Sequence, residues 1–282
     1  STGEAQVQIP LDQIGGEIEI VCKRGITRIP LLKEILKLYF LKLNIFSLHA
    51  SAIEYDQKGI VVLGWAQGGK TSALLAYIQQ GARFVADDWV LYDSENDRVF
   101  GLPGRLSISD HHIQQMPVLK SKLEKSTRLR LWGLKQLINF LSLVAKVFRW
   151  GIAHKAINML QGLLQVSLHP KDIFLPKSII EYVSPRKMVF MTSHSEIAFE
   201  AQEITQNELV DFIIPANDFE YNHLRETYLA FLFAFPGRRN LLIERRQYIE
   251  ISLLKRALIG KETFRIYHPY PFQISAFIKN IL

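Results

Sequence analysis

The chain has 282 residues, of which 48% are apolar and 22% are charged. This apolar share excludes an intrinsically disordered chain and is enough for one large domain or two small ones. No uncharged apolar run reaches the about 18 residues that a membrane-spanning helix needs. The 34 basic residues exceed the 27 acidic ones and give a net charge of +7, which suits nucleic acid, an anionic membrane or an acidic substrate equally well.

The chain contains a single cysteine, Cys22. An intramolecular disulfide and a zinc site built on paired cysteines are therefore excluded. The residues before Lys23 lack the basic start and apolar stretch of a cleavable signal sequence, so we expect a cytoplasmic protein, a chain trimmed of its leader being the alternative.

The elements predicted in the first half follow from apolar periodicity and turn residues. In chain order they are a strand over 16–22, a helix over 31–43 after Pro30, a hairpin of strands 46–55 and 59–64, a helix over 70–80 capped by Gly81, and strands over 83–93 and 98–102. A strand, a glycine-bearing turn, a helix and another strand in this order are typical of a nucleotide site.

The second half begins with a basic, helical segment from residue 120 to about 166, in which we expect breaks at Gly133 and Gly151. The elements predicted after it are strands within 178–192, helices within 204–234, a strand over 262–267 and a last helix over 272–282. His111 and His112 predict a polar helix start rather than a metal site, because adjacent side chains on a helix do not face one another.

Residues 64–71 read GWAQGGKT and match the phosphate-loop pattern G-x-x-x-x-G-K-[ST] between an apolar strand and a helix. In such a loop backbone N–H groups hold phosphate oxygens, the lysine neutralises their charge and the threonine hydroxyl binds Mg²⁺. A glycine-rich turn that only caps the helix is the alternative. The residues expected to contact the nucleotide are Gly64, Gln67, Gly68, Gly69, Lys70, Thr71 and Ser72.

Two carboxylates, Asp87 and Asp88, end the strand that follows the phosphate-loop helix. One could hold Mg²⁺ and the other could accept a proton from an attacking hydroxyl, whereas a solvated turn is the alternative. His49 is expected in the middle of a strand, where a buried core histidine is the default interpretation.

Residues 48–93 resemble the kinase core of the HPr serine kinase/phosphorylase family, in which a histidine on a strand, a phosphate loop and an A-D-D element occur in this order. The similarity continues through residues 100–108 and is weak elsewhere. It implies an α/β fold like that of phosphoenolpyruvate carboxykinases, with a mixed β-sheet and flanking helices instead of a doubly wound parallel sheet. The chain looks like the compact kinases of the family, some of which serve biosynthesis clusters.

The resemblance also implies site roles. Asp87 would be the general base, His49 would orient or tune it, Lys70 would act on the transferring phosphate, and Asp88 and Thr71 would hold the metal, with the two aspartate roles open to exchange. ATP and Mg²⁺ would be the cofactors, and the γ-phosphoryl group would pass to a serine-type hydroxyl of a peptide, protein or biosynthetic small molecule. Further candidates for phosphate contact are Arg105, Arg238 and Arg239.

The loop departs from the family's usual G-x-S-G-x-G-K-[ST] at Ala66 and Gln67. This departure leaves open a nucleotide-binding docking or sensor module that transfers no phosphate. Because no phosphorylase signature follows the core, we do not expect reverse phosphorolysis.

The charge pattern divides the chain into residues 1–118 as the first part of the kinase core, 119–167 as a basic helical insertion and 168–282 as the part that completes the core. Between residues 120 and 155 nine basic residues face one acid, which leaves the rest of the chain near neutral. This segment could be an interfacial helix, a docking surface for an acidic acceptor or a merely solvated face. A homo-oligomer stays open, and no nucleic-acid-binding signature is found.

Overall fold

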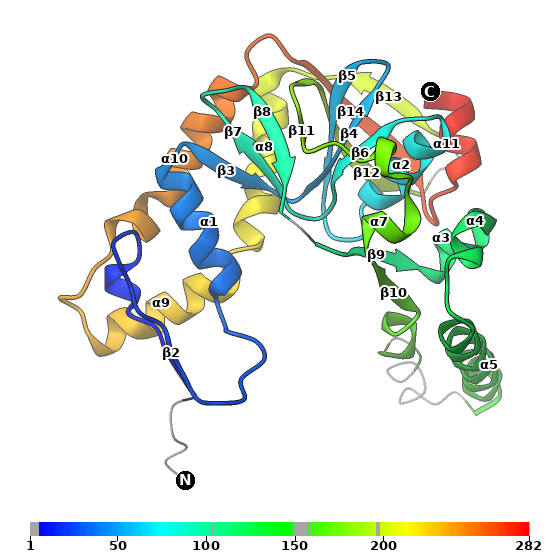
Figure 1. The fold of residues 1–282 in the computed structure, drawn as a ribbon, viewed down its shortest axis with the longest axis horizontal. Helices are drawn as coiled ribbons and strands as arrows, with labels where there is room; N and C mark the ends of the chain where they lie inside the picture. Colours follow the sequence, from blue (N-terminus) through cyan, green and yellow to red (C-terminus); the bar gives the residue numbers. More distant parts are fainter. Residues whose placement is uncertain (1–5, 103, 149–156, 158, 196–197, 282) are drawn as a thin grey trace.

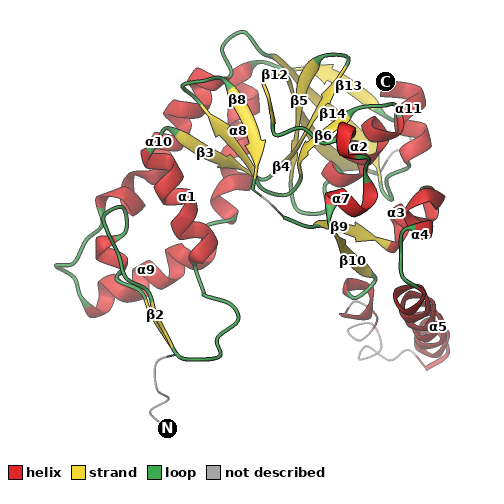
Figure 2. Ribbon diagram, in the orientation of Figure 1, coloured by secondary structure: helices red, strands yellow, loops and turns green. Residues whose placement is uncertain are grey.

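The computed structural model describes residues 6–102, 104–148, 157, 159–195 and 198–281, without the side chains of 144 and 146–148. Two main β-sheets are flanked by helices, with one helical arm extending on each side (Figures 1 and 2). The mixed sheet with flanking helices that the sequence predicts is confirmed. No helix of the described residues is both long and apolar enough to cross a membrane.

The larger sheet has six strands. Their order is β13 (Glu200–Glu203), β14 (Glu262–Pro269), β12 (Pro185–His194), β5 (Lys58–Gly64), β4 (Ala50–Tyr55) and β6 (Arg83–Ala86). The strands β14, β12 and β5 run parallel, whereas β13, β4 and β6 are antiparallel to their neighbours. The predicted hairpin is confirmed as β4 and β5, and the strand and helix predicted at the end of the chain appear as β14 and α11 (Ile274–Ile281).

The smaller sheet has four antiparallel strands. Their order is β11 (Tyr182–Val183), β8 (Arg98–Gly101), β7 (Val90–Asp93) and β3 (Ile45–Leu48). The predicted strands 46–55 and 83–93 are each wrong as single elements, because each splits between the two sheets. The first splits at His49 and the second at residues 87–89, and the two breaks lie opposite one another, since Ala52 pairs with Ala86 and Leu48 with Val90.

Apolar cores lie on both faces of the six-stranded sheet. On one face α2 (Lys70–Gln79) and α11 pack through Leu74 and Phe277. On the other, α8 (Gln206–Phe219) and α10 (Leu241–Ala257) pack against both sheets. No element is predicted at α10, because its buried ion pair of Arg246 with Glu250 interrupts the apolar pattern.

The arm formed by the N-terminal region has a third apolar core, between α1 (Leu32–Lys42) and α9 (Asn222–Ala234). The short 3-10 helix η1 (Leu11–Gln13) and the paired strands β1 (Val7–Gln8) and β2 (Val21–Cys22) complete this arm. The strand predicted over 16–22 is wrong except at its end. Ile18 and Ile20 alternate as expected, but they pack against this core without a neighbouring strand.

The other arm contains the basic segment. Its elements are β9 (Leu106–Ser109), α3 (Asp110–Gln115), α4 (Pro117–Ser121), α5 (Lys125–Phe148) and β10 (Gln165–Leu168), followed by α7 (Pro170–Ile173) and η2 (Pro176–Ser178). The break predicted at Gly133 is wrong because a single glycine is tolerated within the long α5, and Gly151 lies outside the described residues. β10 pairs with β9 and leads the chain back to the sheets. The three-part division of the chain stays a prediction.

We expect Phe277→Ala to lower the free energy of unfolding by about 3–5 kcal/mol, because large-to-small changes in a packed core leave a cavity. The Phe277 ring is 0% exposed and contacts Tyr77, Phe199 and Phe272. The matched control is Phe233→Ala at a ring that is 93% exposed, for which we expect a change within about 0.5 kcal/mol. Urea denaturation followed by circular dichroism measures both, and equal losses would contradict this assignment of the core.

Candidate functional site

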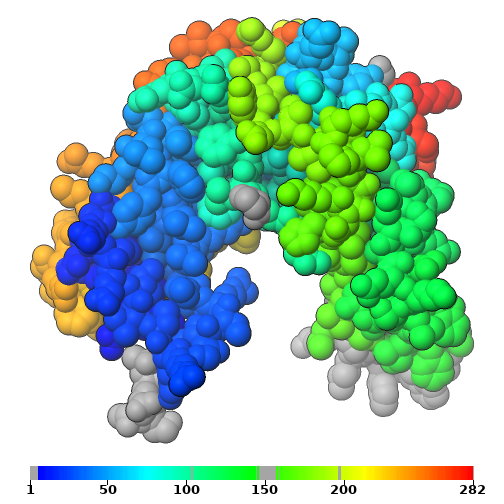
Figure 3. Space-filling view, in the orientation of Figure 1, coloured from blue at the N-terminus to red at the C-terminus, as the bar shows by residue number. Residues whose placement is uncertain are grey.

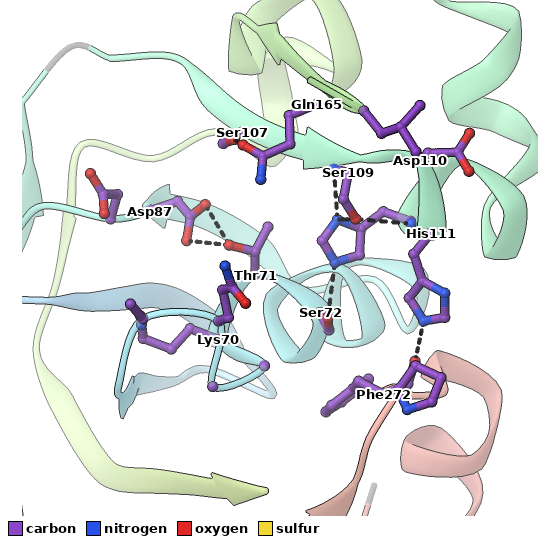
Figure 4. A pocket seen from close by; sticks show the side chains of 18 of the residues that line it. Lys70, Thr71, Ser72, Asp87, Ser107, Ser109, Asp110, His111, Gln165 and Phe272 are labelled. Atoms are coloured by element: carbon purple, nitrogen blue, oxygen red, sulfur yellow. Dashed lines mark hydrogen bonds between the residues drawn. The ribbon is translucent and has the colours of Figure 1, made fainter. Parts of the chain in front are cut away.

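A cavity of about 850 Å³ opens beside the end of β5 and the first turn of α2 (Figure 4). The loop 66–69, the turn after β6, the start of α3 and the segment 268–272 line it, together with residues that precede β10. The cavity therefore gathers the phosphate-loop pattern and the Asp87–Asp88 pair, which the sequence separates by the whole of α2.

The loop itself bends tightly. Gly64 has φ +156°, and a Cβ there would lie 3.1 Å from the carbonyl oxygen of Met191 on the neighbouring strand β12. Gly69 has φ +87°, and a Cβ there would lie 3.0 Å from Nε2 of His268. The same ring nitrogen lies 3.0 Å from the Gly68 carbonyl oxygen. Gln67 takes a left-handed φ of +61°. This conformation costs more free energy for glutamine than for the glycine that the family's loop usually has there.

The Lys70 ammonium is held inside the loop. It donates to the carbonyl oxygens of Gly64 at 3.0 Å and of Trp65 at 2.7 Å, and the residue is only 6% exposed. Burial lowers the pKa of Lys70 to about 8. A cation held in a desolvated loop is stabilised by a nearby anion, so the loop favours an anionic ligand.

Asp87 faces the start of α2. The Thr71 hydroxyl donates to its Oδ2 at 3.0 Å (Figure 4). The Ser51 hydroxyl of β4 donates to its Oδ1. Burial raises the pKa of the Asp87 carboxyl, an effect that these two hydrogen bonds oppose. Ser51 is not among the predicted site residues, although its place on the strand beside the phosphate-loop strand offered a signal.

Asp88 points the other way along the same turn. Its backbone has φ +68° and its side chain is 63% exposed, with Oδ1 3.5 Å from Nε2 of His49. The other ring nitrogen of His49, Nδ1, lies 2.8 Å from Oε1 of Glu220 at the end of α8. An ionised carboxylate only accepts hydrogen bonds, so Nδ1 carries the proton of this bond and the ring is oriented with Nε2 toward Asp88.

The histidine is supported by groups that no local sequence signal indicates. Its hydrogen bond lowers the pKa of Glu220 to about 2. Asn217, also on α8, accepts from the His49 backbone N–H at 3.4 Å. From α1, the Lys33 ammonium lies 3.5 Å from Asp88 and that of the buried Lys37 3.9 Å from Glu220. These residues are far from His49 and Asp88 in sequence, and only the tertiary fold brings them together.

Two of the remaining predicted contacts lie at the cavity. The Ser72 hydroxyl lies 2.9 Å from Nε2 of His112, whose pKa burial lowers to about 4. The polar helix start predicted at His111 and His112 is confirmed, because Ser109 caps α3 through His112. Arg105 lines the cavity and donates to Ser167.

Arg238 and Arg239 are not brought to the cavity. Both arginines lie in the loop between α9 and α10. Arg238 pairs with Asp12 of η1 at 2.8 Å, and Arg239 pairs with Glu244 of α10 at 2.8 Å. Both guanidinium groups are therefore neutralised by nearby carboxylates, away from the cavity. In the sequence, the pair is not next to any other predicted site residue, which was a signal against this role. Among the described residues no group of three or more His, Cys, Asp or Glu side chains forms a metal centre by itself.

Comparisons with known proteins give little beyond this geometry. No family model matches the chain, and no curated protein matches it. Among solved structures, the HPr(Ser) kinase/phosphatase from Coxiella burnetii is similar at 12% identity, covering 64% of this chain and 96% of that one, with a TM-score of 0.28. A similarity at that TM-score carries no argument about function, so the functional argument depends on the site itself.

We expect Glu220→Gln to lower the stability of the protein most at neutral pH. A carboxyl whose folded pKa is depressed stabilises the fold above its unfolded pKa of about 4.5, and this contribution is lost as the pH falls toward about 2. Urea denaturation at about pH 7 and about pH 3.5 should therefore show a difference from the unmodified protein that shrinks on acidification. Glu226→Gln, at an exposed position of α9, is the control. A difference independent of pH would contradict the His49–Glu220 bond.

Proposed function

We propose that this protein is an ATP- and Mg²⁺-dependent kinase that transfers the γ-phosphoryl group to a hydroxyl acceptor. One observation carries the proposal. The end of the β6 strand presents two carboxylates, Asp87 against Thr71 at the phosphate loop and Asp88 against His49 at the open side. A site that only binds nucleotide needs the first of these, whereas a second, oriented carboxylate is what a hydroxyl nucleophile requires.

The residues present fit a triphosphate and its metal. A Cβ at Gly68 would lie 2.9 Å from the Trp65 carbonyl oxygen, so the loop follows a path that only a small residue permits. The first turn of α2 adds N–H groups without partners in the helix, which suit phosphate oxygens. Lys70 adds a desolvated cation, and Thr71 with Asp87 forms an oxygen pair of the kind that Mg²⁺ prefers.

The geometry favours the exchanged aspartate roles. Phosphate-loop enzymes hold Mg²⁺ between the loop Ser or Thr and an aspartate at the end of a neighbouring strand, and it is Asp87 that contacts Thr71. Asp88 is exposed and its Oδ1 lies 3.5 Å from Nε2 of His49, a position that suits a base that must reach a substrate hydroxyl. We therefore assign Asp87 to the metal and Asp88 to the proton, the reverse of the assignment that the family resemblance puts first.

The chemistry follows from these positions. Bound Mg·ATP supplies the phosphoryl group, with its charge partly neutralised by the metal. The acceptor oxygen forms a bond to the γ-phosphorus while the bond from that phosphorus to the β–γ bridging oxygen breaks. Asp88 would take the hydroxyl proton, His49 with both ring nitrogens protonated would donate from Nε2 to hold Asp88 in place, and Lys70 would stabilise the charge on the transferring phosphate. Arg105, at the cavity wall, is a further candidate for that charge.

The acceptor is expected to be a serine-type hydroxyl of a peptide, protein or small molecule. The alternative function, a nucleotide-dependent docking or sensor module, depends on the altered loop at Ala66 and Gln67 and on the Lys70 ammonium turned to loop carbonyls. It leaves the His49–Asp88 contact without a role, so we place it second.

We expect Lys70→Ala to lower phosphoryl transfer by about 100-fold or more, because it removes the charge nearest the phosphates. Radiolabelled ATP with a library of serine-containing peptides measures transfer, and calorimetry measures binding of Mg·ATP. The matched control is Lys58→Ala, at an exposed lysine that begins β5 and lies outside the cavity. An undiminished Lys70→Ala variant would contradict the proposal.

We expect variants of Asp87 and Asp88 to affect different steps, the first Mg·ATP binding and the second phosphoryl transfer. Asp87→Asn should weaken the binding of ATP in Mg²⁺ but not in its absence, because the carboxylate holds the cation. Asp88→Asn should leave Mg·ATP binding within about threefold and lower transfer by about 10²–10⁴-fold, the usual contribution of a general base. Calorimetry and the peptide assay test both variants, and the opposite pattern would restore Asp87 as the base. If the unmodified protein binds Mg·ATP and transfers phosphate to no acceptor, the sensor function is favoured.

A further inference from the structure

The long helix α5 buries one face and exposes an apolar one. Leu131, Ile138 and Ala145 are between 5% and 8% exposed and pack toward the protein. The exposed residues Leu129, Trp132, Phe140 and Leu143 are between 60% and 68% exposed. Large exposed apolar side chains gathered on one element usually mark an interaction surface.

Helical geometry places these four residues together. At about 100° per residue they fall within about 80° of the helix circumference, opposite the buried residues. The stripe from Leu129 to Leu143 extends about 21 Å along the helix at 1.5 Å per residue. We call these four residues the apolar stripe of α5.

The charge around the stripe is positive. Lys120, Lys122, Lys125 and Arg128 lie at or just before the start of α5, are exposed and form no ion pair with another described residue. The only acid between residues 120 and 148 is Glu124. Arg130 and Lys135, in contrast, are engaged with Gln165 and Asp110. An apolar face flanked by unneutralised cations complements a surface that is both apolar and anionic.

We propose that α5 binds the surface of an anionic phospholipid membrane. The apolar stripe enters the boundary between headgroups and acyl chains, and the four cations contact headgroup phosphates. Helices that lie in a membrane surface have this composition, with Trp, Phe and Leu on one face and Lys or Arg beside them. Trp132 has the indole ring that is enriched at that boundary.

The shape of this surface favours a bilayer over an acidic peptide. The stripe is the outer side of a single helix, and none of its residues lines the cavity of the phosphate loop. An amphipathic peptide binds in a groove between apolar walls, whereas a bilayer accepts one convex helix lying in its plane. The helix also lies on an arm that extends away from both sheets, so the body of the protein can stay in water (Figures 1 and 3).

Sedimentation with vesicles tests this proposal on the full chain. We expect the protein to pellet with vesicles of three parts phosphatidylcholine and one part phosphatidylglycerol, and much less with phosphatidylcholine alone. Each Lys or Arg near an anionic surface contributes about fivefold to binding, so Lys125→Gln with Arg128→Gln should weaken it about 25-fold. Added salt should weaken it further.

Apolar variants separate insertion from simple attraction of charge. Trp132→Ala with Phe140→Ala should lower the partition coefficient by at least tenfold, because both rings leave water on binding. The matched control, Phe233→Ala with Tyr248→Ala, removes two exposed rings from α9 and α10, far from α5 in the fold, and should change nothing. Circular dichroism confirms that each variant is folded.

A label reports where the helix lies. Cys22 is the only cysteine, so an environment-sensitive fluorophore on Leu143→Cys in a Cys22→Ser background should shift to shorter wavelength with anionic vesicles, unlike one on Tyr248→Cys. No pelleting by the unmodified protein, or pelleting that survives loss of the two aromatic rings, would overturn the proposal. A labelled peptide of alternating Glu and Leu tests the alternative partner. The surface would be assigned to an acidic peptide instead if this peptide bound saturably, if changing the apolar stripe abolished that binding, and if the protein did not bind vesicles. None of these readouts depends on phosphoryl transfer.

Discussion

The candidate site depends on a pair of antiparallel strands that leaves one sheet and enters the other at a single junction. One strand makes this passage at His49 and its partner at residues 87–89, so the breaks stay opposite one another. At a break the regular alternation of side chains stops, and adjacent residues can point to different places. Asp87 consequently faces Thr71 and Asp88 faces His49. Two neighbouring carboxylates thereby acquire different surroundings, as the proposed roles of one as a metal ligand and the other as a base require.

Three charges near this junction, those of Asp87, Lys70 and Glu220, are partly or largely removed from water, and each has a compensating partner. A buried ion without a partner would cost several kcal/mol, which limits how such a site can be built. Asp87 has two hydroxyl donors, Lys70 has two carbonyl acceptors, and Glu220 has His49 and Lys37. Left-handed backbones at Gln67 and Asp88 add strain of about 1–3 kcal/mol each. Strain of this size in a cavity wall is common where function, rather than stability, determines the conformation.

Local signals predicted much of the fold and part of the site. The glycine pattern, the hairpin at β4 and β5, and Gly81 with its φ of +88° after α2 all express short-range rules. Periodicity could not reveal that a continuous β-rich run passes between two sheets, because both halves remain buried. Nor could it find Glu220, whose only relation to His49 is tertiary, or α10, whose buried ion pair resembles a polar surface. The apolar stripe of α5 was visible only as composition until burial showed which face was turned outward.

The central claim is that Thr71 and Asp87, which are in contact, together hold one Mg²⁺. A double-mutant cycle on Mg·ATP affinity tests this claim most directly. Calorimetry would compare Thr71→Val, Asp87→Asn and the double variant with the unmodified protein. If both groups hold the same cation, each single change weakens binding and the double variant binds about as weakly as the weaker single one. Two losses that simply add would mean that the groups act independently. That result would contradict a shared metal site at the junction of the two sheets.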